Sequence, residues 1–327
     1  MRVFRSAWFR ISLALLVIAG LVQFNRINLA TFAALGDRWP WVVAAFAVML
    51  PSYAIVSIRF WIVLRNQGMN VPFKLALRWT MIGAFFDLAM PSNSGGDIIK
   101  GAYVVRHAGV GMRTRGIMAV AFDRVLGLIG LFLLASIAIV AGWHYVRQIP
   151  GGNKLLILLP LATAGALMFF RVLGARRLYN NRRFEEAVMR MPGGARLHGV
   201  IGSFNSLRER PAEFFAVLAL SVLNHVCWCV ALLCITRAFG LSVGVVQGFA
   251  VFPLAIFGNT FGFAGGFGIG TAAFDLVFSS LLHVSVGAAV GLTFQVLGAM
   301  SRLAGLPFYI HHPRQSTEAE PLTRSQT

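Results

Sequence analysis

Charged residues are scarce in this chain of 327 residues, at 12% of the sequence, and only 11 of them are acidic. Soluble domains carry about 25% charged residues, so about half of the charge that a soluble surface needs is missing. Hydrophobic residues make up 57% of the chain, and its mean hydropathy is +0.74. Several apolar runs reach about 20 residues, the length that crosses the hydrocarbon core of a bilayer. The composition therefore excludes an ordinary soluble domain and predicts an all-α, polytopic membrane protein.

Motifs for catalysis and metal binding are also missing. The three cysteines, Cys227, Cys229 and Cys234, lie in one apolar run without metal-ligand spacing or a CxxC pattern, which favours packing as small buried side chains. No His/Glu cluster has metal spacing, and the sequence contains no Walker motif and no G-x-S-x-G elbow. We therefore predict no metal, no cofactor and no catalytic residue.

The net charge of +18 comes from basic residues in the loops between apolar runs. This distribution is typical of cytoplasmic loops, so we predict anionic lipid headgroups as partners and no nucleic acid. Arg2, Arg5 and Arg10 precede the first apolar run. Because no A-x-A-like cleavage site follows, we interpret that run as a crossing helix and not as a signal peptide.

Nine apolar spans are expected, and the basic loops predict their orientation. The spans lie at about 8–24, 39–64, 75–90, 117–143, 155–170, 214–239, 243–261, 271–282 and 285–310. Arg78 and Arg106 flank a polar break after the third span, and both are expected in the cytoplasm. The segment between them must enter and leave by the same face, as a re-entrant hairpin. The same count places both flanks of a second break, near Arg237 and His283, on the outer side.

Six crossings and two re-entrant helical hairpins then form an inverted repeat. Residues 1–150 form the first repeat, with a hairpin at about 78–106 that opens to the cytoplasm. Residues 151–312 form the second, with a basic amphipathic linker at 171–210 and an outward-opening hairpin at about 243–282. Within the linker, residues 178–191 have the spacing of an amphipathic helix, with a solvated linker as the alternative. Residues 313–327 are expected to be a disordered tail. Both termini are expected in the cytoplasm, and the chain in the inner (cytoplasmic) membrane.

The two breaks are polar and rich in glycine, at 90–97 (MPSNSGGD) and 258–270 (GNTFGFAGGFGIG). Non-helical backbone at membrane depth is tolerated only where protein buries it or water reaches it. Paired breaks in the two halves of a transporter indicate a substrate site near the membrane midplane. We therefore expect the two hairpin tips to face each other or a shared cavity. For the second break, tight helix packing through glycine is the alternative.

In the first break, Asp97 is expected to cap a helix that starts at Ile98, after two glycines that allow close backbone approach. The N-terminus of a helix attracts phosphate, and nearby basic side chains add formal charge. The alternative is a plain turn without a ligand. The substrate-binding residues predicted from this break are Ser94, Gly95, Gly96, Asp97, Lys100 and Arg106.

Outside the first break, Arg124 can bind a lipid phosphate, pair with Asp123, Asp97 or Asp87, or extend to the surface. The substrate-binding set predicted from the second break is Asn259, Gly265, Gly266 and Thr271. Asp87 and Asp275, one in each hairpin, are candidates for proton uptake, with helix-to-helix hydrogen bonding as the alternative. Asn224 and His225 are interpreted as a satisfied interhelical pair.

Three strings carry a resemblance to a known family: GAFFDLAMPSNSGGDIIKGAYVVRHAG, AFDRVLGLIGLF and GGFGIGTAAFD. Over about residues 12–309 the chain resembles the membrane region of lysylphosphatidylglycerol synthases. It is also similar to flippase-like membrane proteins that consist of that region alone. The resemblance implies lipid translocation, and it implies that the family pattern is matched by Pro91, Gly95, Gly96, Asp97 and Arg124.

Two positions depart from the pattern that the resemblance implies. The family usually has Arg where Lys100 stands, so the charge is kept while the bidentate fork is lost. It often has Glu where Thr271 stands, so a carboxylate is missing from the second break. These departures leave the identity of the lipid open. The large soluble aminoacyltransferase domain of the synthases has no counterpart in this sequence, so aminoacyl transfer by the chain alone is not expected.

The expected function is that of an integral inner-membrane, flippase-like transporter that moves an anionic or modified phospholipid or a polyprenyl lipid between leaflets. One alternative is an intramembrane lipid-headgroup transferase, for which Asp97 with Asp87 or Asp123 would be the acid/base pair. Another is an accessory subunit of a lipid- or hopanoid-modifying enzyme. The expected partners are a membrane lipid with a phosphate or charged headgroup, and either a second copy of the chain or a separate lipid-modifying enzyme.

Overall fold

The computed structural model describes residues 32, 34–89, 95–149, 151–173, 186, 189–190, 194–261 and 266–310. These residues fold into helices and contain no β-strand. The elements are α2 (Ala34–Asp37), α3 (Trp39–Asn66), α4 (Phe73–Ala89), α5 (Gly95–His107), η3 (Val110–Met112), α6 (Arg113–Ala141), α7 (Trp143–Val146), α8 (Gly152–Leu173), α11 (Gly194–Glu209), α12 (Pro211–Ala238), α13 (Val245–Asn259), α14 (Ile269–Val277), the π-helix η4 (Phe278–Leu282), α15 (Gly287–Leu303) and α16 (Leu306–Ile310).

Five helical segments of the described chain are long and apolar enough to cross a membrane: Trp39–Asn66, Arg113–Ala141, Gly152–Val172, Pro211–Ala238 and Gly287–Ile310. They confirm the predicted polytopic, all-helical membrane protein. The first predicted crossing (8–24), most of the linker helix (178–191) and the tail (313–327) lie outside the described residues. The count of six crossings and the cytoplasmic termini therefore stay predictions.

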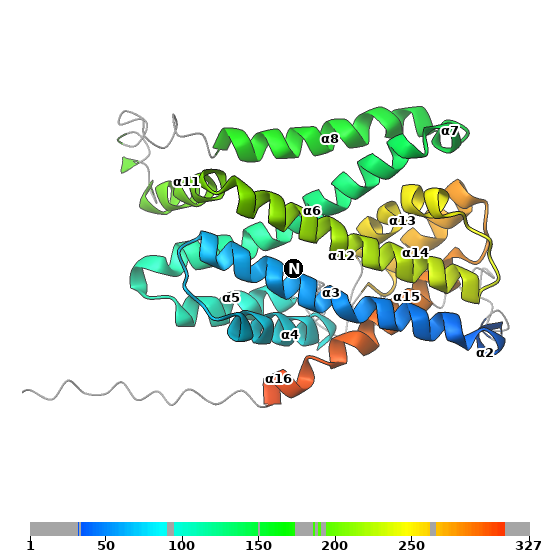
Figure 1. The fold of residues 1–327 in the computed structure, drawn as a ribbon, viewed down its shortest axis with the longest axis horizontal. Coiled ribbons are helices and arrows are strands. Elements are labelled where there is room, and N and C mark those ends of the chain that lie inside the picture. The colour runs from blue at the N-terminus through cyan, green and yellow to red at the C-terminus, as the bar shows by residue number, and fades with distance from the viewer. Residues whose placement is uncertain are drawn as a thin grey trace, which may run out of the picture.

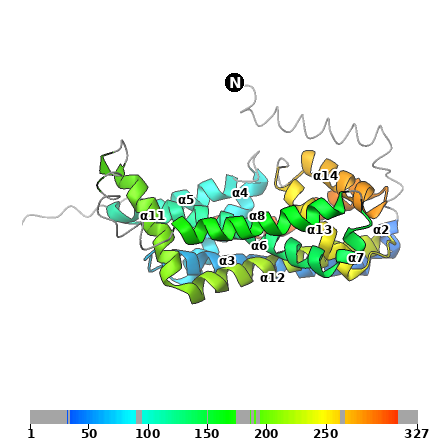
Figure 2. The ribbon, with the colours of Figure 1, turned by 90° about the horizontal axis from the view of Figure 1, so that it is seen from above.

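Two pairs of shorter helices lie between the long ones. Helices α4 and α5 pack on each other, as do α13 and α14. With 9 to 17 residues each, they span about 14 to 26 Å, less than the hydrocarbon core of about 30 Å. The two pairs occupy opposite ends of the long axis in Figure 1, and the view from above agrees (Figure 2). Two hairpins that enter from opposite sides would have this arrangement.

The long helices α3 and α12 are built alike. Each has 28 residues, a proline in its first turn and a glycine with positive φ just after its end, Gly68 (φ 79°) and Gly240 (φ 78°). Only glycine adopts this conformation without strain, and it ends a helix by satisfying the last carbonyl groups. The same closing hydrogen bond follows both: Met69 N–H donates to Leu64 O, and Leu241 N–H donates to Thr236 O.

Helices α3 and α12 run antiparallel, side by side along the molecule (Figure 1). At one end, Asn66 Nδ2 in the last turn of α3 donates to Glu213 Oε2 in the first turn of α12, at 2.9 Å. At the other end, Gly240 after α12 lines a cavity together with Arg38, which precedes α3. The two similar helices therefore have opposite directions.

A residue of the first half corresponds to the residue of the second half that lies as far along the chain from it as Pro211 lies from Trp39. We call this constant difference in residue number the repeat register. It places Trp39–Asn66 on Pro211–Ala238 end for end, and Gly68 on Gly240. It also places Gly96 on Gly268, at the start of the second helix of each short pair. In this register each α-helix from α3 to α6 falls on an α-helix between α12 and α15. The similar helices of the two halves thus have a defined residue correspondence.

Small residues allow the helices to approach closely. A Cβ added to Gly130 of α6 would overlap the side chain of Ser221 on α12, and one added to Gly291 of α15 would meet the ring of Phe274 on α14. In lipid, helix association depends on such close packing, because lipid tails are as apolar as the side chains. Several glycines of the apolar runs thus lie at helix contacts.

Candidate functional site

A cavity of about 260 Å³ lies between the two halves of the described chain. Its walls come from α3, α4, α5 and α6 of the first half and from α12, α13 and α15 of the second. Asp87 and Gly96 reach it from the first pair, and Asn259 and Thr260 from the second. The described ends of both breaks thus border one cavity, while the residues at their tips, 90–94 and 262–265, lie outside the described residues.

Three buried charged residues join α3, α5 and α6 on one side of the cavity. Asp123 Oδ1 accepts a hydrogen bond from Arg59 Nε at 2.8 Å, and its Oδ2 accepts one from Lys100 Nζ at 2.7 Å. Lys100 Nζ also lies 4.3 Å from the centre of the Phe60 ring. A charge within the membrane is costly unless a partner compensates it. The Arg59–Asp123–Lys100 cluster therefore holds three separate helices together.

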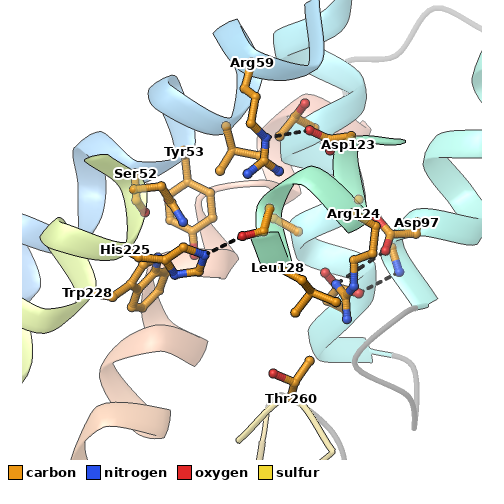
Figure 3. Close-up of a pocket in the computed structure, with 18 of the residues that line it drawn as sticks. Ser52, Tyr53, Arg59, Asp97, Asp123, Arg124, Leu128, His225, Trp228 and Thr260 are labelled. Atoms are coloured by element: carbon orange, nitrogen blue, oxygen red, sulfur yellow. Dashed lines mark hydrogen bonds and ion pairs between the residues drawn. The ribbon is translucent and has the colours of Figure 1, made fainter. Parts of the chain in front are cut away.

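A second ion pair lies nearer the opening. Arg124 Nη1 is 3.4 Å from Asp97 Oδ2, and the two side chains remain 36% and 25% exposed. Figure 3 shows them facing each other beside the cavity. Lys100 Nζ lies 3.6 Å from the other oxygen of Asp97, Oδ1. Of the three arrangements open to Arg124 from the sequence, the structure contains the pair with Asp97.

The predicted cap of α5 was wrong. The helix starts at Gly95, so Asp97 lies in its first turn. The capping carboxylate is Asp87 of α4, whose Oδ1 accepts the Gly96 N–H at 2.8 Å. Asp97 is thereby left to face Lys100 and Arg124. Proton uptake by Asp87 stays a prediction.

A neutral amide plays the corresponding part in the second half. Gln295 of α15 donates through Nε2 to Asn259 Oδ1 at 2.8 Å and to Gly266 O at 2.9 Å. Its Oε1 accepts a hydrogen bond from Thr271 Oγ1 at 2.7 Å. In the repeat register Gln295 falls on Asp123. One side chain from the following long helix thus secures each hairpin, by charge in the first half and by an amide in the second.

The remaining predicted residues divide into three groups. Gly96, Asp97, Lys100, Arg124 and Asn259 line the cavity, as does Asp87. Gly95, Arg106, Gly266, Thr271 and Asp275 are described but do not line it. Ser94 and Gly265 lie outside the described residues.

Sequence reasoning left other cavity residues out of the site. They include Ser52, Tyr53, Arg59, Asn224, His225, Trp228 and Arg302. A polar residue in an apolar run was the only local indication for most of them. Asn224 and His225 were expected to be satisfied, yet Asn224 Oδ1 and His225 Nδ1 are buried without a hydrogen-bond partner among the described residues.

The charged side chains that line the cavity do not cancel. Four are cations and three are carboxylates in their usual ionisation states, which leaves one positive charge: Arg59, Lys100, Arg124, Arg302, Asp87, Asp97 and Asp123. Electrostatic attraction is stronger in a low-dielectric interior than in water. The cavity is therefore suited to a ligand with a negative charge.

Residues 8–304 match the family model described as the lysylphosphatidylglycerol synthase TM region. The chain belongs to this family. Membership indicates a function related to membrane lipids. No match to a curated protein or to a solved structure was found. The region shared with the family includes every cavity residue, from Ser52 to Arg302.

In this family member, Gln295→Leu is expected to lower the stability by about 1–3 kcal/mol, because it leaves buried polar groups of the second hairpin unpaired. Thermal unfolding in detergent measures the effect. Thr293→Val on the same helix is the matched control, since Thr293 Oγ1 donates to Ala289 O within α15 itself. Equal melting temperatures for the two variants would show that the Gln295 contacts contribute little.

Proposed function

We propose that the chain is a transporter, and not an enzyme, that moves lipids with an anionic, phosphate-bearing headgroup between membrane leaflets. The observation that carries this proposal is the positively charged cavity bordered by the ends of both short helix pairs. In transporters, substrate sites lie at the interface of two repeats, where interrupted helices present their ends to the ligand.

The size of the cavity supports a mechanism in which only the headgroup of the lipid passes through the protein. A volume of about 260 Å³ lies just below the range of about 300–1,000 Å³ for small-molecule sites. It accommodates a phosphodiester headgroup but not two acyl chains. The tails would remain in the surrounding lipid while the headgroup crosses.

The two halves support alternating access. Helices α3 and α12 are similar and antiparallel, and the repeat register relates the helices that follow them. We interpret this as the inverted repeat expected from the charge pattern. Rocking of one half against the other would open the cavity first to one leaflet and then to the other.

Arg124 is the residue we assign to the lipid phosphate. Its guanidinium is a partly exposed cation beside the cavity, and the carboxylate that faces it, Asp97, is also partly exposed. A guanidinium binds phosphate through two parallel hydrogen bonds. A lipid phosphate that replaces the Asp97 carboxylate as the partner of Arg124 would keep the Arg124 charge paired while the headgroup enters the cavity.

The transferase alternative has less support. Both oxygens of Asp123 are bound by cations, and Asp97 faces Arg124 and Lys100. A general base needs a free carboxylate oxygen within reach of the reacting proton. These contacts favour a positioning role for both aspartates.

Transfer of fluorescent lipids in proteoliposomes tests the proposal, with dithionite quenching of the outer leaflet as the readout. We expect protein-dependent transfer of phosphatidylglycerol. Arg124→Gln should slow it at least about tenfold, the effect of losing one charge-assisted contact of about 1.5–3 kcal/mol.

Arg147→Gln is the control for that substitution, because Arg147 stacks on Trp143 and does not line the cavity. It should retain the rate of the unmodified protein. Vesicles without protein give the baseline. Transfer at that baseline for every anionic and polyprenyl lipid tried would contradict the proposed function.

A further inference from the structure

We propose that the second half of the cavity is a subsite for hydroxyl groups, so that the cargo is an anionic phosphodiester lipid whose headgroup ends in a polyol. The inference rests on the proposed function for the identity of the cargo. It rests on the side chains of α12 and α15 for the chemistry.

The repeat register pairs the walls of the cavity. Five residues that line it from the first half have their counterparts on the opposite wall: Ser52 and Asn224, Tyr53 and His225, Val56 and Trp228, Ala84 and Ile256, Asp87 and Asn259. The cavity thus lies between two equivalent surfaces. Any chemical difference between the two surfaces would therefore determine which end of a headgroup faces which wall.

The difference is one of charge. Asp87 and Asp123 correspond to the amides Asn259 and Gln295. The cations of the first half have apolar counterparts: Arg59, Lys100 and Arg124 correspond to Ala231, Ala272 and Val296. Amides keep the hydrogen-bonding capacity of carboxylates without their charge. The second wall therefore has amides where the first has carboxylates, and the charged side chain that it contributes to the cavity lining is Arg302. The partly exposed Arg124 of the first wall remains the cation assigned to the phosphate.

Two acceptor atoms on the second wall have no partner among the described residues. Asn224 is 6% exposed, and its Oδ1 is buried without a hydrogen bond from any described group. His225 Nε2 lies 3.1 Å from Gly127 O. Because a carbonyl only accepts, Nε2 carries the hydrogen, and in the neutral ring Nδ1 is then an acceptor. That atom is likewise buried with no described donor in reach.

These two neighbouring residues of α12 both line the cavity, and Figure 3 shows His225 beside Tyr53 and Trp228 at its wall. Buried acceptors without partners are costly and uncommon in folded proteins. A ligand that brings two donors would satisfy them. Adjacent hydroxyl groups of a glycerol or sugar supply donors without adding charge.

An ammonium group is the other donor that could fit, since Trp228 packs on Phe294 with ring centres 5.3 Å apart and aromatic faces attract cations. Charge argues against it. Arg302 of α15 lines the same cavity, and its Nη1 is buried without an acceptor in the described part of the chain. A second cation would face this guanidinium in a cavity that is already positive. Neutral hydroxyl groups avoid that repulsion.

Two lipids of equal charge test the subsite in proteoliposomes of the full chain. Fluorescent phosphatidylglycerol and phosphatidylmethanol both carry one negative charge, but only the first has headgroup hydroxyl groups. We expect phosphatidylglycerol to be transferred at least about tenfold faster, because a site built to bond a hydroxyl rejects an analogue that lacks it. This comparison needs no variant.

Variants then assign the preference to α12. Asn224→Leu and His225→Phe should each bring the ratio of the two rates towards one. Leu223→Ala, at a neighbouring position that is 47% exposed and does not line the cavity, should keep the ratio of the unmodified protein. Equal rates for the two lipids in the unmodified protein, or faster transfer of phosphatidylethanolamine than of phosphatidylglycerol, would overturn the subsite.

A binding measurement separates this inference from the proposed function. Native mass spectrometry of the detergent-purified protein compares retention of phosphatidylglycerol and phosphatidylmethanol. If neither lipid is transferred above the protein-free baseline, transport fails, and binding alone decides the subsite. Preferential retention of phosphatidylglycerol, lost in Asn224→Leu, would then support it. Equal retention would overturn it.

Discussion

Asp123→Asn is expected to destabilise the protein by about 3–5 kcal/mol, the cost of removing one partner from a buried ion pair. Asparagine keeps the shape of the side chain but cannot neutralise Arg59 and Lys100. Both cations are buried, with side chains only 7% and 6% exposed. Arg59 would then lose its carboxylate partner between apolar helices, and Lys100 would keep only the more distant Asp97, at 3.6 Å.

The loss of stability should be large because the cluster is buried and joins three helices. Asp123 receives hydrogen bonds from α3 and from α5 while it belongs to α6. A surface ion pair can be replaced by water, whereas these charges have little access to it. The expected result is a much lower melting temperature in detergent, together with a loss of lipid transfer.

An exposed ion pair provides the control. Arg210 Nη1 lies 3.2 Å from Glu213 Oε1, with the two side chains 55% and 33% exposed. Arg210→Gln should change stability by no more than about 1 kcal/mol. Both variants are compared by tryptophan fluorescence during heating in the same detergent. If Asp123→Asn melted together with Arg210→Gln, the cluster would not be a main support of the fold.

Much of the fold could be predicted because its cause is local. Apolar runs of membrane length form five long helices. Each of the two glycine-rich breaks falls between the two helices of one short pair. Each of these features depends on neighbouring residues and on the solvent around them. Composition and charge order are sufficient to find such features.

The Arg59–Asp123–Lys100 cluster could not be predicted in the same way. Its members lie 64 and 23 positions apart on three helices. The sequence assigns Lys100 to the substrate and Asp123 to Arg124 or to acid/base chemistry, and nothing local joins either of them to Arg59. The cap of α5 failed for a related reason. Asp97 is close to the break in sequence, but the packing of α4 on α5 brings Asp87 to the Gly96 N–H instead.

The register of the repeat was hidden by the chemistry that distinguishes the halves. Asp87 and Asp123 have amides as counterparts, and three cations have apolar residues, so the positions that matter most are those that look least alike. Once the helices were paired by length and end geometry, the repeat register followed from Gly68 and Gly240. The inverted repeat stays a prediction from charge counting, whereas the residue correspondence of the similar helices needed the structure.

Gly96→Ala is expected to lower stability by about 2–4 kcal/mol, from overpacking and from loss of the cap of α5. A Cβ at Gly96 would overlap the backbone oxygen of Gly83 and would come within 2.9 Å of Asp87 Cγ. Neither the backbone of α4 nor the capping carboxylate can move without opening the hairpin. We therefore expect both a lower melting temperature and slower lipid transfer.

Gly101→Ala on the same helix should have the opposite effect. A Cβ at Gly101 would have no described atom within 4 Å apart from its chain neighbours and the nearby backbone of its own helix. Alanine is favoured over glycine inside a helix by about 0.5–1 kcal/mol. The two substitutions add the same methyl group to α5, so only its surroundings differ. Melting curves in one detergent decide the matter. Stabilisation by both substitutions would mean that α4 and α5 are not held as closely as Gly83 and Gly96 indicate, and the first wall of the cavity would lose its rigid support.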